Sequence, residues 1–267
     1  MTDTDTPIVR MTDIHKSFGH VQALRGVDLD LYAGRVLGLI GDNGAGKTTL
    51  VKIMAGVFPP SRGTVHYKGE QVRWKNPSQS RAAGLEIVYQ DLGLVPIMNI
   101  ARNFFLGKEP RSRWGFLDFD HMATESLRAI TEMGIFLDDA EELVENLSGG
   151  ERKALAISRS LYFGVQVLML DEPTAALSVK ETHAVLDLME TLKERGIATV
   201  FITHNIHHAY AVSDHFIALN AGVKVLDADK ADVTPEMLTE AVIGEPLAQV
   251  TSQSLAASVE NGSPENR

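Results

Sequence analysis

The sequence predicts an α/β protein with a mainly parallel core sheet, an antiparallel β edge and an inserted helical subdomain. Three observations lead to this prediction. Apolar runs at 36–40, 165–170 and 199–202 have the length and composition of buried parallel strands. An amphipathic segment at 179–195 separates the last two runs, which is the spacing of a βαβ unit. The stretch 92–163 has a helical pattern instead.

The elements before residue 60 follow from local patterns. Residues 8–31 alternate apolar and polar side chains around a central turn, so we expect antiparallel strands there. The run at 36–40 is then a buried strand, 41–46 a glycine-rich loop, and 47–55 a helix. Together these residues predict a strand-loop-helix unit.

The helical stretch contains three candidate helices, near 97–106, 119–133 and 151–163. They lie between the strand-loop-helix unit and the later strands of the sheet. We therefore expect them to form a subdomain that is inserted into the α/β core.

Composition bounds the domain organisation. A chain of 267 residues with 44% hydrophobic and 22% charged residues can bury one large core. We expect one domain over 1–246, with its helical subdomain at about 92–163, and a disordered tail at 247–267, which is rich in Ser, Gln, Asn and Glu. No internal repeat or second glycine-rich loop is present, so one module per chain is expected.

Several classes of protein are disfavoured. No apolar run approaches the about 20 residues that span a bilayer. The first residues are polar and acidic, unlike a secretory signal, and cysteine is absent, so we expect a cytoplasmic protein without disulfides. A net charge of -10 repels phosphate backbones, so no nucleic acid is expected as a partner.

The glycine-rich loop carries a phosphate-binding motif. Its matches to G-x-x-x-x-G-K-[ST] are Gly41, Asp42, Asn43, Gly44, Ala45, Gly46, Lys47 and Thr48. Glycines let backbone N–H groups and the helix N-terminus face the phosphates, while Lys47 adds a charge and Thr48 can ligate Mg²⁺. We expect these residues and the adjoining Thr49 to bind a nucleotide. The alternative is an ordinary glycine-rich turn with an exposed lysine.

Two adjacent carboxylates, Asp171 and Glu172, end the apolar run at 165–170. Strand alternation directs the two side chains differently. Asp171 can hold Mg²⁺ through water, and Glu172 can accept a proton from an attacking water or polarise it. The alternative reading of this pair is an ordinary cap or turn.

Three further features accompany the phosphate-binding motif and the acidic pair in the sequence. They are Gln90, His204, and the run Leu147, Ser148, Gly149 and Gly150. With these five motifs in this order along the sequence, the chain resembles the ATP-binding subunits of ABC transporters from about residue 8 to residue 244. The resemblance implies a P-loop NTPase fold of the ABC type, ATP and Mg²⁺ as cofactors, and ATP hydrolysis coupled to transport.

The resemblance also implies a role for the glycine-rich signature. In the family, the signature of one protomer closes over the γ-phosphate held by the phosphate loop of another, which assigns Ser148, Gly149, Gly150 and Glu151 to nucleotide binding. The dipole of the following helix favours an anion there. The same residues fit a capping box, S-x-x-E, and both readings can hold at once.

Three single residues take their roles from the resemblance alone. Gln90 matches the glutamine that meets Mg²⁺ and water, His204 the histidine that contacts the γ-phosphate and positions water, and Phe18 the aromatic that stacks on adenine. A core phenylalanine and a structural histidine are the alternatives. His207 and His208 could join His204 in a zinc site, but no carboxylate or cysteine completes the set.

The segments 84–90 and 99–107 resemble the monosaccharide branch of the family, the ribose, xylose and fructose importers. The resemblance implies integral-membrane permease subunits, a periplasmic or extracellular sugar-binding protein, and a location at the cytoplasmic face of the membrane. Because many members fuse two modules and this chain has one, a homodimer is expected with ATP bound. The surface 92–105, with its apolar patch 95–98, should dock the permease, unless that patch packs within the lobe.

Two departures from the family pattern bear on turnover. Ser178 stands where most members have aspartate, and Glu151 stands where the signature usually has glutamine. We expect reduced hydrolysis. Two other functions stay open on the sequence: a soluble ABC ATPase acting on ribosomes or nucleic acid rather than on a permease, and a non-hydrolysing regulatory binder.

Overall fold

The computed structural model describes residues 6–244. The expected tail at 247–267 lies outside these residues. The elements in chain order are β1 (Val9–Phe18), β2 (Val21–Leu31), β3 (Val36–Ile40), α1 (Lys47–Met54), β4 (Arg62–Tyr67), β5 (Glu70–Val72), α2 (Pro77–Ala82), β6 (Leu85–Val88), α3 (Ile100–Phe105), α4 (Phe119–Thr131), η1 (Val144–Asn146), α5 (Gly149–Tyr162), β7 (Val167–Asp171), α6 (Val179–Glu194), β8 (Ala198–Thr203), α7 (Ile206–Val212), β9 (His215–Asn220), β10 (Val223–Asp229), η2 (Lys230–Asp232) and α8 (Pro235–Ile243).

Two sheets form the core. The larger has the strand order β10-β9-β3-β8-β7-β6, in which β9, β3, β8, β7 and β6 run parallel and β10 pairs antiparallel with β9. The smaller has the order β2-β1-β4-β5 and is antiparallel. The predicted fold class is confirmed, although the antiparallel strands expected at 8–31 belong to a separate sheet, and the antiparallel edge of the large sheet is β10.

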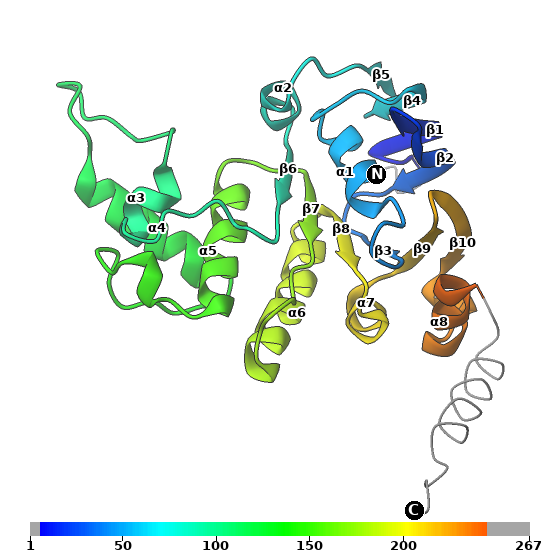
Figure 1. Ribbon diagram of the computed structural model, residues 1–267. Helices are drawn as coiled ribbons and strands as arrows, with labels where there is room; N and C mark the ends of the chain where they lie inside the picture. Colours follow the sequence, from blue (N-terminus) through cyan, green and yellow to red (C-terminus); the bar gives the residue numbers. More distant parts are fainter. Residues whose placement is uncertain (1–5, 245–267) are drawn as a thin grey trace, which may run out of the picture.

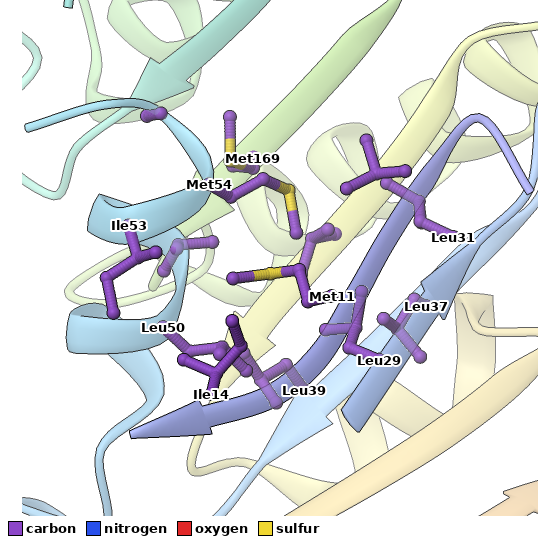
Figure 2. Close-up of a cluster of buried hydrophobic side chains, with 14 of the residues drawn as sticks. Met11, Ile14, Leu29, Leu31, Leu37, Leu39, Leu50, Ile53, Met54 and Met169 are labelled. Carbon is purple, nitrogen blue, oxygen red and sulfur yellow. The ribbon is translucent and has the colours of Figure 1, made fainter. Parts of the chain in front are cut away.

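Side-chain alternation along β3 explains why the large sheet is buried on both faces. Leu37 and Leu39 pack with α1 and the small sheet, while Val36 and Ile40 belong to a second cluster on the opposite face, with α5, α6, α7 and α8. Figure 2 shows the first cluster, in which Met54 of α1 lies beside side chains from both sheets. Each fully buried aliphatic side chain of this kind contributes about 1.5–3 kcal/mol.

The helices α3, α4 and α5 form a lobe beside the sheet, beyond β6 (Figure 1). A third apolar cluster holds the lobe together, and the rings of Phe104 and Tyr162 meet edge to face with centroids 5.3 Å apart. Two helix starts differ from the sequence prediction because of capping. The Asn99 side chain accepts a hydrogen bond from the backbone N–H of Arg102, so α3 begins at residue 100, and Ser148 caps α5, which begins at residue 149.

Figure 1 also shows elements that the sequence patterns did not assign, among them α2, β4, β5, β9, β10 and α8. Strands β9 and β10 extend the large sheet past β3, and α8 packs against β9 in the second apolar cluster. Within residues 6–244, no helix has the length and apolar character needed to cross a membrane.

Candidate active site

The candidate site lies at the carboxyl ends of three neighbouring parallel strands, β3, β8 and β7. Ile40 of β3 pairs with Thr203 of β8, and Asp171 of β7 pairs with Ile202 of β8. The residues that directly follow these strands therefore emerge at one edge of the sheet. In open parallel sheets, ligands bind at this edge.

The loop from β3 to α1 requires glycine at two positions. Gly41 has φ 147° and Gly46 has φ 105°, both outside the region that other residues favour. A Cβ at Gly46 would lie 2.7 Å from the carbonyl oxygen of Ala23, and one at Gly41 would collide with the carbonyl oxygen of Leu219. Gly46 caps α1 without a side-chain hydrogen bond, so the helix presents backbone N–H groups to the loop.

Lys47 begins α1 and reaches back across the loop. Its Nζ donates hydrogen bonds to the carbonyl oxygens of Gly41 at 2.5 Å and Asp42 at 3.0 Å, and the residue is only 6% exposed. Burial lowers the pKa of Lys47, and the nearby carboxylates of Glu172, Asp171 and Asp42 partly oppose this. The amine is thus held over the loop rather than extended into solvent, contrary to the alternative of an exposed lysine.

Thr48 and Asp171 place two oxygen atoms together beside this amine. The Thr48 hydroxyl donates a hydrogen bond of 3.4 Å to Oδ2 of Asp171. Burial and, less strongly, the neighbouring Glu172 raise the pKa of Asp171, while the bond from Thr48 and the charge of Lys47 lower it. Hydroxyl and carboxylate oxygens are the donor set that Mg²⁺ prefers, so the residues present fit that ion.

Glu172 follows Asp171, and its side chain is hydrogen-bonded to residues at the end of β8. Its Oε1 accepts a hydrogen bond of 3.0 Å from the backbone N–H of His204 and lies 2.8 Å from Nδ1 of the same ring. Its Oε2 accepts a hydrogen bond of 3.0 Å from the hydroxyl of Thr203. The carboxylate is 15% exposed and the His204 side chain 59% exposed. Glu172 also has φ 50°, a left-handed conformation that costs free energy in a residue with a side chain.

The glycine-rich signature lies at the start of α5. Ser148 and Glu151 form a complete capping box, in which each side chain accepts a hydrogen bond from the backbone N–H of the other residue. Gly150 donates its N–H to Oε1 of Glu181 at 3.0 Å, and Oε2 of Glu181 accepts hydrogen bonds from the backbone and hydroxyl of Ser178. These bonds hold the pKa of Glu181 at about 2. One carboxylate therefore joins the starts of α5 and α6.

Other predicted site residues lie at the surface. Gln90 follows β6, is exposed, and makes no hydrogen bond to Thr48 or Asp171 within the described part of the chain. Phe18 ends β1, is 48% exposed, and contacts the ring of Phe58 edge to face at 5.3 Å. Over residues 6–244 no group of three or more potential metal ligands among His, Cys, Asp and Glu lies together.

Three residues at the site were not found from the sequence. Thr203 and Glu181 have the contacts described above. Lys153 of α5 is buried, and its Nζ donates hydrogen bonds to the carbonyl oxygens of Pro173 and Ala175. Burial lowers the pKa of Lys153 to about 8. A polar residue at the end of a buried strand, a lysine on the inner face of a helix and a second S-x-x-E pattern were the available signals.

Comparison with known proteins gives consistent matches. Residues 24–175 match the family model described as ABC transporter. The xylose/arabinose import ATP-binding protein of Sulfolobus acidocaldarius is 40% identical, over 91% of this chain and 96% of the relative. The fructose import ATP-binding protein of Rhizobium meliloti is 39% identical, over 85% and 90%. The ribose import ATP-binding protein of Caldanaerobacter subterraneus is 35% identical over 91% of this chain, which spans only 49% of that relative.

Solved structures agree in fold. An ATP-binding cassette of an ABC transporter in its ADP conformation superposes with a TM-score of 0.77 at 21% identity, over 92% of this chain and 98% of the other. A nucleotide-free ATP-binding cassette also reaches 0.77, at 22% identity, over 90% and 96%.

Proposed function

The chain belongs to the ABC transporter family, and we propose that it is the ATP-binding and ATP-hydrolysing subunit that energises a monosaccharide importer. The observation that carries the proposal is the convergence of a phosphate loop, an acidic pair and a histidine at one edge of the sheet. Each group follows its own parallel strand, and each has the chemistry that one step of ATP hydrolysis needs.

The phosphate loop binds the nucleotide. Backbone N–H groups of residues 41–49 and the N-terminus of α1 surround the β- and γ-phosphates, and the charge of Lys47 is directed across the same loop. Thr48 and Asp171 would hold Mg²⁺, with Gln90 as a further ligand. The ion would supply positive charge against the phosphate oxygens. Phe18, exposed at the tip of β1, would stack on the adenine.

Glu172 accepts the proton of the attacking water in this scheme. The water oxygen bonds to the γ-phosphorus, the bond to the β-phosphate oxygen breaks, and ADP leaves with the electron pair of that bond. His204 and Gln90 orient the water, and His204 contacts the γ-phosphate. Support comes from the position of Glu172, which is hydrogen-bonded to His204 and adjoins Asp171.

Two chains form the hydrolysing unit. The signature residues 148–151 begin α5 in the lobe, and Figure 1 shows β6 and β7 between α5 and α1. A signature in this position is suited to the nucleotide of a second copy. ATP would favour the closed dimer by binding it more tightly than the open one, and hydrolysis would reset it.

A groove between the lobe and the sheet supports docking of a permease. It has a volume of about 380 Å³ and is lined by residues of β6, of the loop at 91–93, of the segment 106–108 that follows α3, and of α5. Ile97, in the loop before α3, is 77% exposed. We assign the surface 92–105 and this groove to the permease subunits, which would hold the chain at the cytoplasmic face of the membrane.

The sugar class rests on the relatives, whose names specify import of xylose and arabinose, fructose, or ribose. A sugar-binding protein outside the membrane would deliver the cargo to the permease. The chain itself would read the transport state through its lobe and would not touch the sugar.

The proposal is tested by isolating the tagged full-length chain from membranes of its own cells in mild detergent. We expect integral-membrane subunits to co-purify, and ATP hydrolysis of the reconstituted complex to rise at least about fivefold when a pentose or hexose and its binding protein are added. Lys47→Ala is the matched control and should abolish hydrolysis while keeping the complex. Recovery of nucleic acid or ribosomes instead, released by salt, would contradict the proposal.

A further inference from the structure

Thr203 is the last residue of β8 and is fully buried. Its Oγ1 lies 3.0 Å from Oε2 of Glu172 and 3.0 Å from the backbone N of Asn205. The hydroxyl is therefore placed between the carboxylate and the first residues of the segment that carries His204.

The chemistry of the three groups fixes the direction of both bonds. A backbone N–H can only donate, so Thr203 accepts from Asn205. A hydroxyl has one hydrogen, and the carboxylate of Glu172 accepts, so that hydrogen goes to Oε2. The backbone N–H of His204 donates to Oε1 in the same way. Both oxygens are thus held by donors that stay in place when the histidine ring turns away.

The backbone of Glu172 is attached to the same strand. Its N–H donates a hydrogen bond of 2.9 Å to the carbonyl oxygen of Ile202, and its side chain is hydrogen-bonded to Thr203 and to the backbone of His204. Without the hydroxyl of Thr203, only Oε1 would remain fixed, and the carboxyl group could rotate about its own axis. A general base that accepts a proton must keep one orientation toward the attacking water.

We propose that Thr203 is a positioning residue for hydrolysis, which fixes the plane of the Glu172 carboxylate through a hydrogen bond to Oε2. The proposal rests on the role of Glu172 given under the proposed function. The contacts of the Thr203 hydroxyl are with Glu172 and the backbone N–H of Asn205. It acts only through Glu172, so its loss should reduce the rate of the chemical step and leave nucleotide binding unchanged.

The test compares steady-state hydrolysis of Mg-ATP by the full chain and three variants. Thr203→Val removes the hydroxyl and should lower kcat at least about tenfold, with KM for ATP within about twofold. Thr203→Ser keeps the hydroxyl and should restore kcat to within about threefold. Thr199→Val is the matched control, because Thr199 lies on the same strand, is also fully buried, and has no hydrogen-bond partner for its hydroxyl among the described residues. Its kcat should not change.

Folding and the role of Glu172 are checked separately. Thermal melting and ATP binding show whether each variant is folded. If the Thr203→Val variant does not fold, Thr203→Ala replaces it in the same comparison. The proposal is overturned if kcat is unchanged without the hydroxyl, or if Thr203→Ser is as impaired as Thr203→Val. Glu172→Gln distinguishes the two levels. If it abolishes hydrolysis while Thr203→Val does not, this inference alone fails, whereas an active Glu172→Gln contradicts the proposed role of Glu172 itself.

Discussion

The Oε1 oxygen of Glu172 lies 2.8 Å from Nδ1 of His204 and also accepts a hydrogen bond from the backbone N–H of that residue. Glu172, the proposed base, and His204, the proposed phosphate contact, are thus within hydrogen-bond distance of each other in one chain. If the His204 ring turns toward a γ-phosphate, Glu172 loses its contact with the ring. It keeps the hydrogen bonds from the backbone N–H of His204 and from the hydroxyl of Thr203.

Replacement of His204 by alanine separates these two contacts. We expect kcat for ATP to fall at least about tenfold, because the γ-phosphate and water lose a positioning group. Thermal stability should change by less than about 1 kcal/mol, since pairs with an exposed partner contribute little. His207→Ala, an exposed histidine one turn further on, is the control for histidine loss. Equal activities of the two variants would contradict the role of His204.

Asp171→Asn should stabilise the nucleotide-free chain and weaken its use of Mg²⁺. Burial raises the folded-state pKa of Asp171 above its ordinary value of 3.8, so the folded chain binds the proton more tightly than the unfolded chain. Stability contributed by this group is present below pH 3.8 and is lost as pH rises through the folded pKa. At pH 7 the asparagine variant should melt at a higher temperature, and it should need more Mg²⁺ for half-maximal hydrolysis. A variant with lower melting temperature and unchanged Mg²⁺ dependence would refute this account.

Two glycines of the phosphate loop make a matched pair for backbone space. Gly44 and Gly46 both have positive φ, 83° and 105°, but a Cβ meets nothing within 4 Å at Gly44 and lies 2.7 Å from a carbonyl oxygen at Gly46. Gly44→Ala should cost about 1–2 kcal/mol of unfolding free energy. Gly46→Ala should cost about 1–3 kcal/mol more, through overpacking against fixed backbone. Urea unfolding measures both, and equal losses would show that the contact at Gly46 has no effect.

The buried amine of Lys153 should make the free energy of unfolding depend on pH in the alkaline range. Burial lowers its folded-state pKa from 10.5 to about 8, so the unfolded chain binds more protons between these values. The contribution of Lys153 to stability should therefore rise as pH increases from about 8 to 10.5. Urea unfolding at several pH values should show this rise in the unaltered chain and lose it in Lys153→Gln. The exposed Lys180→Gln serves as control and should keep the rise. A slope that survives Lys153→Gln would assign the effect to another group.

The parts of the fold that depend on local sequence were predictable. The run at 36–40 is strand β3 with the same bounds, and the glycine pattern after it indicated the loop whose φ angles only glycine tolerates. Strand β10 was not recognised, because it alternates exposed and half-buried residues without a strong apolar face. Strand β9 was not assigned either, although its four central residues are buried. Elements of this kind are stabilised by their neighbours in the sheet rather than by their own pattern.

Some residues of the candidate site could likewise be predicted from local sequence, and others depend on tertiary packing. Lys47, Thr48, Asp171 and Glu172 are recognisable because motif and strand end coincide in sequence. The bond from Gly150 to Glu181 joins residues that are 31 positions apart, and its existence depends on how α5 packs against α6. Sequence patterns contain no record of such a contact, which is why the link between the signature and Ser178 was missed.

The central claim, that two chains enclose ATP between them, is tested most directly by the solution mass of Glu172→Gln with and without Mg-ATP. Loss of the base should block hydrolysis and hold the closed state, so light scattering should show the mass of two chains with Mg-ATP and of one chain without it. Glu172→Gln combined with Lys47→Ala should stay at the mass of one chain in both conditions. A Glu172→Gln chain that binds ATP, as a fluorescent nucleotide would report, and still keeps the mass of one chain would contradict the claim.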